Sequence, residues 1–349
     1  MNDRGQMSGL EQQPEGSMAR RDVIAIGGSA GALDAMLVVV AGLPPDFGGS
    51  VFVVSHIGPH RSHLPEVLSR AGPLPARHAE DGESIQPGIV YIAPPDRHML
   101  VARDAIRLSR GPRQHFTRPA IDPLFRSLAQ SFGPRVVGVV LSGLGSDGAR
   151  GLREIRQAGG VAVIQEPSAA PYPEMPRNAA AAVRVDHIAA KDELPGLLLR
   201  LSSQTVHVPE IAMVGGGSTI MDQFERPVAL TCPECGGALH RADGPPPEFR
   251  CHTGHHFGAT EIADGQGSAL EGALVVALRV LNERAELCRQ MMESARAARR
   301  DLGVTYWKRL RNEAEEQLEI LVRFLERQPQ PAEPEPNGEP AALEVRTNP

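Results

Sequence analysis

The sequence has no long hydrophobic run, no strong excess of charge of one sign and few cysteines. None of its apolar stretches approaches the roughly 18 to 20 residues that a membrane-spanning helix requires, and the polar N-terminus lacks the apolar core of a signal peptide. The formal net charge is only -6, and no basic block marks a nucleic-acid footprint. We therefore expect a cytoplasmic protein that neither inserts into a membrane nor binds nucleic acid.

Cysteine is too scarce and too unevenly placed for a disulfide framework. Of the four cysteines, Cys232, Cys235 and Cys251 cluster, whereas Cys288 lies in a helical pattern. This distribution predicts a metal site in a reducing compartment.

The 349 residues, of which 41% are hydrophobic, suffice for one large domain or two of ordinary size. Between residues 21 and 201, short apolar runs alternate with longer amphipathic segments. This pattern predicts an α/β domain with a doubly wound, mostly parallel sheet and helices on both faces. The expected strands cover residues 23–26, 51–55, 89–93, 136–141 and 161–165. The expected helices cover residues 32–42, 64–71, 123–131, 149–158, 176–182 and 194–201.

Two short apolar runs between residues 97 and 110 flank Arg103 and Asp104. They predict a hairpin that is added to the main sheet.

Composition divides the remainder of the chain. We expect a flexible leader at 1–20, a Ser-, Thr- and Gly-rich linker at 202–226, a small Cys/His module at 227–260 and a Pro/Glu-rich disordered tail at 329–349. Between 267 and 328, apolar residues recur at helical spacing, which predicts an antiparallel helical hairpin with a solvated, charged outer face. Whether this hairpin dimerises or folds back over the active site stays open.

One hydroxyl stands out at the end of the first strand. Residues 23–33 read as a buried strand, a turn of small residues and a helix, and Gly27, Ser29 and Gly31 match G-x-S-x-G, the pattern of a nucleophile elbow. Glycine-rich turns of this kind also cradle phosphates. The pattern alone therefore does not decide between a nucleophile and a phosphate loop.

Two further polar residues follow strands of the same predicted sheet. His56 follows the strand at 51–55, and Asp147 lies in the turn after the strand at 136–141. Because parallel strands share one carboxyl edge, Ser29, His56 and Asp147 are expected to converge there. A serine needs an imidazole to take its proton, and the imidazole needs a carboxylate to orient it. Taken singly, Asp147 could cap a helix and His56 could be a turn histidine.

Six motifs in order then resemble one known family, the chemotaxis protein-glutamate methylesterases of the CheB type. The resemblance covers about residues 22–201, and its motifs are Ile26–Gly31, Val54–His56, Glu80–Gly82 with Pro87–Pro94, Arg118–Phe125, Leu141–Ala149 and Tyr172–Pro176. The chain order Ser, His, Asp differs from the Ser, Asp, His order of the α/β-hydrolases.

The resemblance implies a catalytic triad of Ser29 as nucleophile, His56 as general base and Asp147 as its orienting partner. It also implies an oxyanion hole formed by the backbone N–H groups of Met175 and Ala30, and no catalytic cofactor. Arg118 lies in a matched motif and would either meet acidic receptor side chains or form a structural ion pair.

The sequence departs from the family pattern beside the nucleophile. Members commonly have Ala-Ser-Thr-Gly-Gly where this chain has Gly28–Ala32, so a hydroxyl is lost at Ala30. Members commonly have Gln-His-Met where this chain has Ser55–Ile57. Regulated members carry a receiver domain in front, but only about twenty residues precede the first strand here. A stand-alone form without that domain is therefore expected.

The function implied by the resemblance is hydrolysis of glutamate methyl esters on chemoreceptors, with deamidation of receptor glutamine as a related activity. The expected partners are methylated chemoreceptor helices, and a methyltransferase or a sensor kinase of the same pathway is a further candidate. Two alternatives stay open: a catalytically weak scaffold or regulator of such a pathway, and a serine hydrolase that acts on another ester.

The Cys/His module offers ligands for a structural metal. Cys232 and Cys235 form a C-x-x-C pair, and Cys251 with His255 supplies a second pair. Four such ligands close a tetrahedral zinc site. His252 or His256 could replace His255, and a vestigial site without metal is the alternative. The segment looks like the zinc-ribbon-like module with helical extension that follows stand-alone methylesterase domains.

Overall fold

The computed structural model describes residues 17–56, 58, 62–208, 226–242 and 247–326. The chain divides into two compact units, residues 1–265 and residues 266–349. Most of the predicted leader, residues 209–225 of the predicted linker and the whole predicted tail lie outside the described residues.

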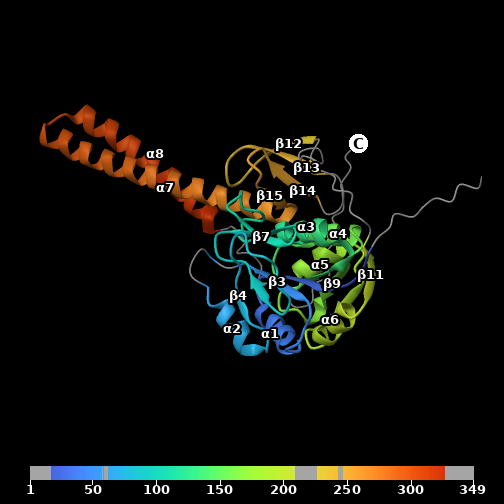
Figure 1. Ribbon diagram of the computed structural model, residues 1–349. Helices are drawn as coiled ribbons and strands as arrows, with labels where there is room; N and C mark the ends of the chain where they lie inside the picture. The colour runs from blue at the N-terminus through green and yellow to red at the C-terminus, as the bar shows by residue number, and fades with distance from the viewer. Residues whose placement is uncertain (1–16, 57, 59–61, 209–225, 243–246, 327–349) are drawn as a thin grey trace, which may run out of the picture. The chain divides into compact units, whose positions relative to one another are not determined.

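A seven-stranded sheet forms the centre of the first unit (Figure 1). Its strand order is β10-β9-β8-β2-β3-β5-β4, and every pairing is parallel. The strands are β2 (Val23–Gly28), β3 (Ser50–Ser55), β4 (Ala76–His78), β5 (Val90–Ile92), β8 (Val136–Val140), β9 (Val161–Gln165) and β10 (His187–Ala189). The five predicted strands are confirmed. The outermost strands, β4 and β10, have three residues each, and sequence reasoning missed them.

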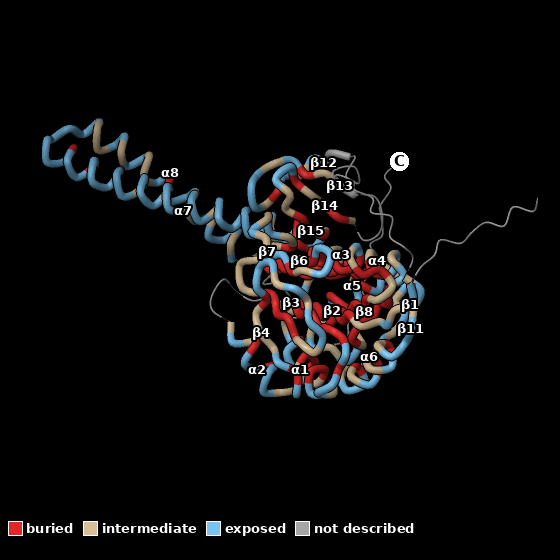
Figure 2. The backbone as a smooth tube through the Cα atoms, in the orientation of Figure 1, coloured by how far each residue is buried: buried red, intermediate tan, exposed pale blue. Residues whose placement is uncertain are grey.

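Helices cover both faces of this sheet. One hydrophobic cluster packs the sheet against α1 (Leu33–Ala41), α2 (Leu64–Ala71) and α6 (Leu194–Ser202). The other packs the sheet against α3 (Ile121–Phe132), α4 (Ala149–Gln157) and α5 (Glu174–Ala182). Figure 2 shows the strands buried between these layers. The central strands β2 and β8 are buried at every residue, as expected for parallel strands that are covered on both faces. The doubly wound fold is confirmed.

The hairpin between residues 97 and 110 does not join the main sheet, so that part of the prediction is wrong. Strands β6 (His98–Ala102) and β7 (Ala105–Ser109) form a separate two-stranded sheet. Met99 and Val101 are buried in the cluster that contains α3, and the Val101 N–H donates to Ser127 Oγ of α3 at 2.9 Å. The apolar face of the hairpin is therefore buried against a helix rather than against the sheet.

A two-stranded ribbon lies where the sequence predicted a leader and a linker. Strand β1 (Ser17–Arg20) pairs antiparallel with β11 (Thr205–Val208). Both strands are largely exposed, so neither carries the apolar pattern by which strands are recognised. Strand pairing therefore extends beyond 21 and 201, the limits predicted for the α/β domain.

The Cys/His module is a small antiparallel sheet. Its strands are β12 (Arg226–Thr231), β13 (Ala238–Ala242), β14 (Glu248–Cys251) and β15 (His256–Gly258). Helix α7 (Ala259–Ala297) follows at once. The helix therefore begins inside the predicted module rather than at residue 267.

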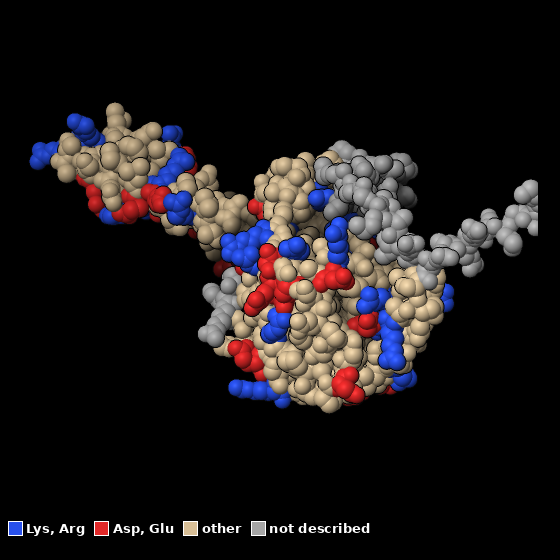
Figure 3. Space-filling view, in the orientation of Figure 1, with Lys and Arg blue, Asp and Glu red and all other residues tan. Residues whose placement is uncertain are grey.

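The second unit contains the remainder of α7 and α8 (Asp301–Glu326), which form the predicted helical hairpin (Figure 1). Among the described residues of this unit, the buried side chains are Cys288, Met292, Ala295 and Ala314. Ion pairs at i, i+4 spacing, such as Arg279 with Glu283, lie on its surface, and Figure 3 shows charges of both signs along it. Among the described residues, no helix combines the length and the hydropathy needed to cross a membrane.

Candidate active site

Ser29 lies directly after β2, at the carboxyl edge of the sheet. Its N–H donates to the Ser142 carbonyl at 2.9 Å, and its carbonyl accepts from the Ala32 N–H at 3.1 Å. Gly31 has a φ of 71°, which glycine adopts without strain. These bonds close the tight turn between β2 and α1 that the G-x-S-x-G pattern predicts.

His56 occupies the neighbouring position on the next strand. Gly28 pairs with Ser55 in the β2–β3 register, and the His56 N–H donates to the Gly28 carbonyl at 3.3 Å. Ser29 and His56 are therefore the next pair along two adjacent parallel strands, which lie about 4.8 Å apart. A direct Ser29–His56 hydrogen bond stays a prediction.

The His56 side chain is hydrogen-bonded to the Asp147 carboxylate. The distance from His56 Nε2 to Asp147 Oδ2 is 2.7 Å, and the Asp147 side chain is 1% exposed. Two main-chain donors of α3 fix the same carboxylate: the Ile121 N–H donates to Oδ2 at 2.7 Å and the Asp122 N–H donates to Oδ1 at 3.0 Å. Because Nε2 faces Asp147, His56 Nδ1 is the ring nitrogen that remains to accept a proton.

The surroundings of Asp147 favour its charged form. Burial alone would raise the pKa of the carboxyl, but the nearby His115, the bond from His56 and the Ile121 N–H hold the pKa well below its usual range. An ionised carboxylate is what a triad needs to orient an imidazole and stabilise its protonated form.

The turn after β8 brings Gly143 against Ser29 and Met175. A Cβ atom on Gly143 would lie 2.9 Å from Ser29 Cβ and would overlap Met175 Sδ, so only glycine fits. The Met175 N–H donates to the Gly143 carbonyl at 3.0 Å. Its role as an oxyanion donor therefore requires this bond to be released, and like that of the Ala30 N–H it stays a prediction.

Arg118 is held within the protein. It donates to Asp96 Oδ1 from Nε at 3.0 Å and from Nη2 at 2.6 Å, and from Nη1 to the carbonyls of Arg110 and Gly111 at 3.1 and 2.8 Å. These contacts favour the structural ion pair over a role in receptor binding.

Sequence reasoning missed two residues next to the candidate triad, His115 and Glu261. His115 contacts Asp122, 7 positions away, and Glu261, 146 positions away. No local motif marks such a pairing, because its members come from a loop, a helix and the chain beyond the Cys/His module.

The Cys/His module brings together the four predicted metal ligands. The ligand atoms of Cys232, Cys235, Cys251 and His255 all lie within 4.8 Å of one another. His255 Nδ1 lies 3.4 Å from Cys251 Sγ and 3.7 Å from Cys232 Sγ, and Cys235 Sγ lies 3.7 Å from Cys251 Sγ. Tetrahedral zinc with bonds of about 2.3 Å to sulfur and 2.0 Å to nitrogen separates its ligands by roughly these distances.

A carboxylate supports the histidine of this cluster. His255 Nε2 lies 3.0 Å from Glu234 Oε2, which leaves Nδ1 directed at the sulfur atoms. Metal-bound histidines usually use their second nitrogen in this way. The residues therefore fit a zinc ion, and they favour His255 over His252 or His256 as the fourth ligand.

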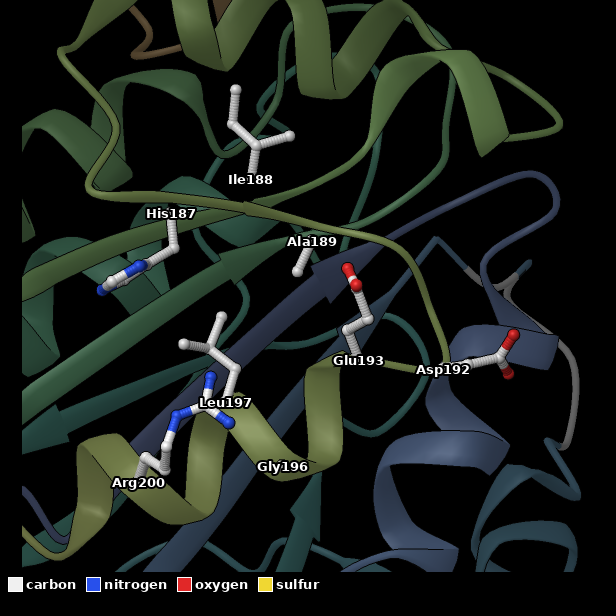
Figure 4. A pocket seen from close by; sticks show the side chains of 8 residues that line it. All are labelled: His187, Ile188, Ala189, Asp192, Glu193, Gly196, Leu197 and Arg200. Atoms are coloured by element: carbon white, nitrogen blue, oxygen red, sulfur yellow. The ribbon is translucent and has the colours of Figure 1, made fainter.

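A separate pocket lies beside β10 and α6, with a volume of about 420 Å³ (Figure 4). Glu193, which lines this pocket, accepts a hydrogen bond at its Oε2 atom from the Ala190 N–H at 3.0 Å. Its lining residues are His187, Ile188, Ala189, Asp192, Glu193, Gly196, Leu197 and Arg200. None of the predicted site residues lines it, so it is distinct from the candidate active site.

The fold and the convergent serine, histidine and aspartate define an α/β domain with a candidate serine-hydrolase site. The CheB methylesterase family model matches residues 24–198, half of the chain. The chain belongs to the CheB methylesterase family.

Individual relatives agree with this assignment. A relative from Leptospira interrogans is 36% identical over 187 residues, which cover 53% of this chain and 97% of the relative. The protein-glutamate methylesterase/protein-glutamine glutaminase 2 of Anaeromyxobacter dehalogenans is 36% identical over 200 residues, which cover 56% of this chain and 59% of that relative. The crystal structure of the Thermotoga maritima CheB methylesterase catalytic domain matches with a TM-score of 0.50 and 28% identity, covering 52% of this chain and 98% of that domain. The family match ends before the Cys/His module begins.

Proposed function

We propose that this protein is a protein-glutamate methylesterase that uses Ser29, His56 and Asp147 to hydrolyse glutamate methyl esters on chemoreceptors. The observation that carries the proposal is the 2.7 Å contact between His56 and Asp147 at the sheet edge where Ser29 occupies the adjacent register position. The relatives' names, protein-glutamate methylesterase/protein-glutamine glutaminase, support protein glutamate methyl esters as the substrate class. The chemoreceptor as substrate comes from the family resemblance.

The chemistry proceeds through an acyl-enzyme. Ser29 Oγ attacks the ester carbonyl while His56 Nδ1 takes the hydroxyl proton, and the oxyanion accepts from the backbone N–H of Ala30 and, once released from Gly143, of Met175. Methanol leaves with the proton from His56. Water then attacks the acyl group with His56 as base, which frees Ser29 and leaves glutamate. Glutamine would follow the same steps with ammonia as the leaving group.

Methanol release from a methylated chemoreceptor tests this proposal. The methylesterase is expected to release methanol catalytically and to leave free glutamate. A stable receptor complex without turnover would instead support a scaffold or regulator, and hydrolysis of small acyl esters without action on receptor would support another serine esterase. A methyltransferase or a sensor kinase of the pathway is the further partner that co-purification from the native cell would reveal.

We also propose that the Cys/His module binds one structural zinc ion. Its ligand set and the Glu234–His255 contact support this proposal. The zinc would cross-link the turn after β12, which carries Cys232 and Cys235, to Cys251 at the end of β14 and to His255 in the turn after β14. The apolar cluster of this module is small. A zinc site of three cysteines and one histidine would need a reducing compartment, and we propose a cytoplasmic location for that reason.

Purified protein is expected to hold about one zinc per chain, and Cys251→Ser is expected to lose most of it, because three ligands bind zinc far more weakly than four. Elemental analysis under non-chelating conditions checks both. Cys288→Ser is the matched control, because Cys288 is a buried cysteine outside the ligand cluster. A content below roughly 0.2 equivalents in the parent protein would favour a vestigial site.

A further inference from the structure

A buried histidine lies among three carboxylates beside the candidate triad. The His115 side chain is 7% exposed. Its Nε2 lies 3.2 Å from Asp122 Oδ2 and 3.9 Å from Asp147 Oδ1, and its Nδ1 lies 3.2 Å from Glu261 Oε1. The main-chain N–H of His115 donates to the His256 carbonyl at 2.7 Å. Both ring nitrogens therefore face acceptors, which suits a protonated imidazole.

Glu261, in the first turn of α7, joins this histidine to the turn that carries Asp147. Its Oε1 atom accepts from the Ser146 N–H at 2.9 Å and from Ser146 Oγ at 3.1 Å, in addition to facing His115. Glu261 Oε1 thus contacts both Ser146, the residue before Asp147, and His115, which lies beside Asp147.

Two glycines leave room for this contact. A Cβ atom on Gly145 would lie 2.8 Å from Glu261 Oε1. A Cβ atom on Gly258 would lie 2.5 Å from Glu261 Oε2 and would overlap Ser146 Oγ. Gly145 also has a φ of 82°, which side chains with a Cβ rarely adopt. The backbone on both sides is therefore shaped to let the carboxylate reach the turn.

Charge balance supports the same arrangement. Burial alone would lower the pKa of His115, but the bonds and charges of Asp122, Asp147 and Glu261 raise it well above its usual value. Burial would raise the pKa of Glu261, but His115 and the Ser146 N–H lower it to about 2. Glu248 on β14 and His256 on β15 are titratable groups that also interact with His115.

We propose that His115 and Glu261 are positioning residues of the esterase site: they hold Asp147 in the orientation that His56 needs. The chain after the Cys/His module thereby completes a site whose candidate triad lies in the α/β domain. Asp122 belongs to the same device, since its Oδ1 accepts from the N–H groups of Gly148 and Gly151 at 3.0 and 2.7 Å. This inference rests on the proposed function for its activity readout.

Glu261→Gln tests the proposal because it removes the charge and keeps the shape. The expected result is a fall in kcat of roughly tenfold, with KM within about twofold of the parent value. A less firmly held Asp147 reduces stabilisation of the transition state more than it reduces substrate binding. In an NMR titration, the pH at which the His115 ring is half protonated should be lower in the variant than in the parent by about one pH unit or more. Asp264→Asn, an exposed carboxylate on the same helix, is the control that should change neither.

An unchanged kcat in folded Glu261→Gln would overturn the proposal, and so would an unchanged His115 titration. If the variant does not fold, Ser146→Ala replaces it, because that change removes only the hydroxyl contact; a fall in kcat of roughly threefold is then expected, and no fall overturns the proposal.

Failure of the proposed function would be recognised separately. If the parent protein releases no methanol, the rate at which a fluorophosphonate labels Ser29 becomes the readout. Labelling that is about tenfold slower in Glu261→Gln supports the positioning role, and an equal rate in the two proteins overturns it.

Discussion

Ser29→Ala is expected to lower kcat for methanol release by about 10⁵-fold, to a rate set by binding and backbone donors alone. The substitution removes a single hydroxyl from a partly exposed residue. The main-chain bonds of Ser29 to Ser142 and Ala32 do not involve that hydroxyl. The thermal unfolding midpoint should therefore shift by no more than about 2 °C. Methanol release and a thermal melt measure the two effects.

Ser203→Ala provides the matched control for this experiment. Ser203 is an exposed serine at the C-terminal end of α6, so its loss should leave kcat unchanged. Equal activity in Ser29→Ala and the parent would remove Ser29 as the nucleophile. If kcat of Ser203→Ala fell as far as kcat of Ser29→Ala, the loss of activity would be due to the protein preparation and not to the missing Ser29 hydroxyl.

Asp147→Asn is expected to lower kcat by roughly 10³- to 10⁴-fold, because an amide does not stabilise a protonated His56 as a carboxylate does. It should also destabilise the fold. Main-chain N–H groups of Ile121 and Asp122 donate to the two different oxygens of Asp147, and an amide nitrogen would face one of these donors. An unpaired buried donor costs about 1–3 kcal/mol, which chemical denaturation can measure.

The exposed carboxylate Asp192 supplies the control, and Asp192→Asn should match the parent in both rate and stability. A kcat within about tenfold of the parent in folded Asp147→Asn would contradict the orienting role assigned to this carboxylate.

The central part of the fold could be predicted from the sequence because its signals are local. Strands β2, β3 and β8 are continuous apolar runs, as parallel strands buried on both faces must be. The helices between them are amphipathic, and the expected range of α2 matches the structure residue for residue. Short outer strands such as β10 carry too few residues to show a period.

Other parts of the fold depend on contacts between distant segments. The β1–β11 ribbon is polar and joins residues near the two ends of the α/β domain, so nothing in either segment predicts its partner. The β6–β7 hairpin was recognised as a hairpin, but its position against α3 depends on which apolar surface is closest in space. The sequence does not predict the start of α7 at Ala259, because the glycines at 265 and 267 disfavour a helix.

The candidate site divides in the same way. Ser29, His56 and Asp147 could be proposed because each follows a strand of one parallel sheet, and the cysteines because their spacing is short. The resemblance to the family added Met175 and Arg118, and the structure shows both already engaged in internal hydrogen bonds. The pairing of His115 with Glu261 depends on how the Cys/His module meets the α/β domain, which no sequence pattern reveals.

Mass spectrometry of the protein after reaction with a serine-directed fluorophosphonate tests the central claim most directly. The predicted result is a single adduct on Ser29 that forms only in the folded protein and forms more slowly in the presence of methylated receptor, because an activated serine nucleophile and the substrate compete for one site. An adduct on another residue, no adduct, or labelling of Ser29 that receptor does not slow would contradict the account.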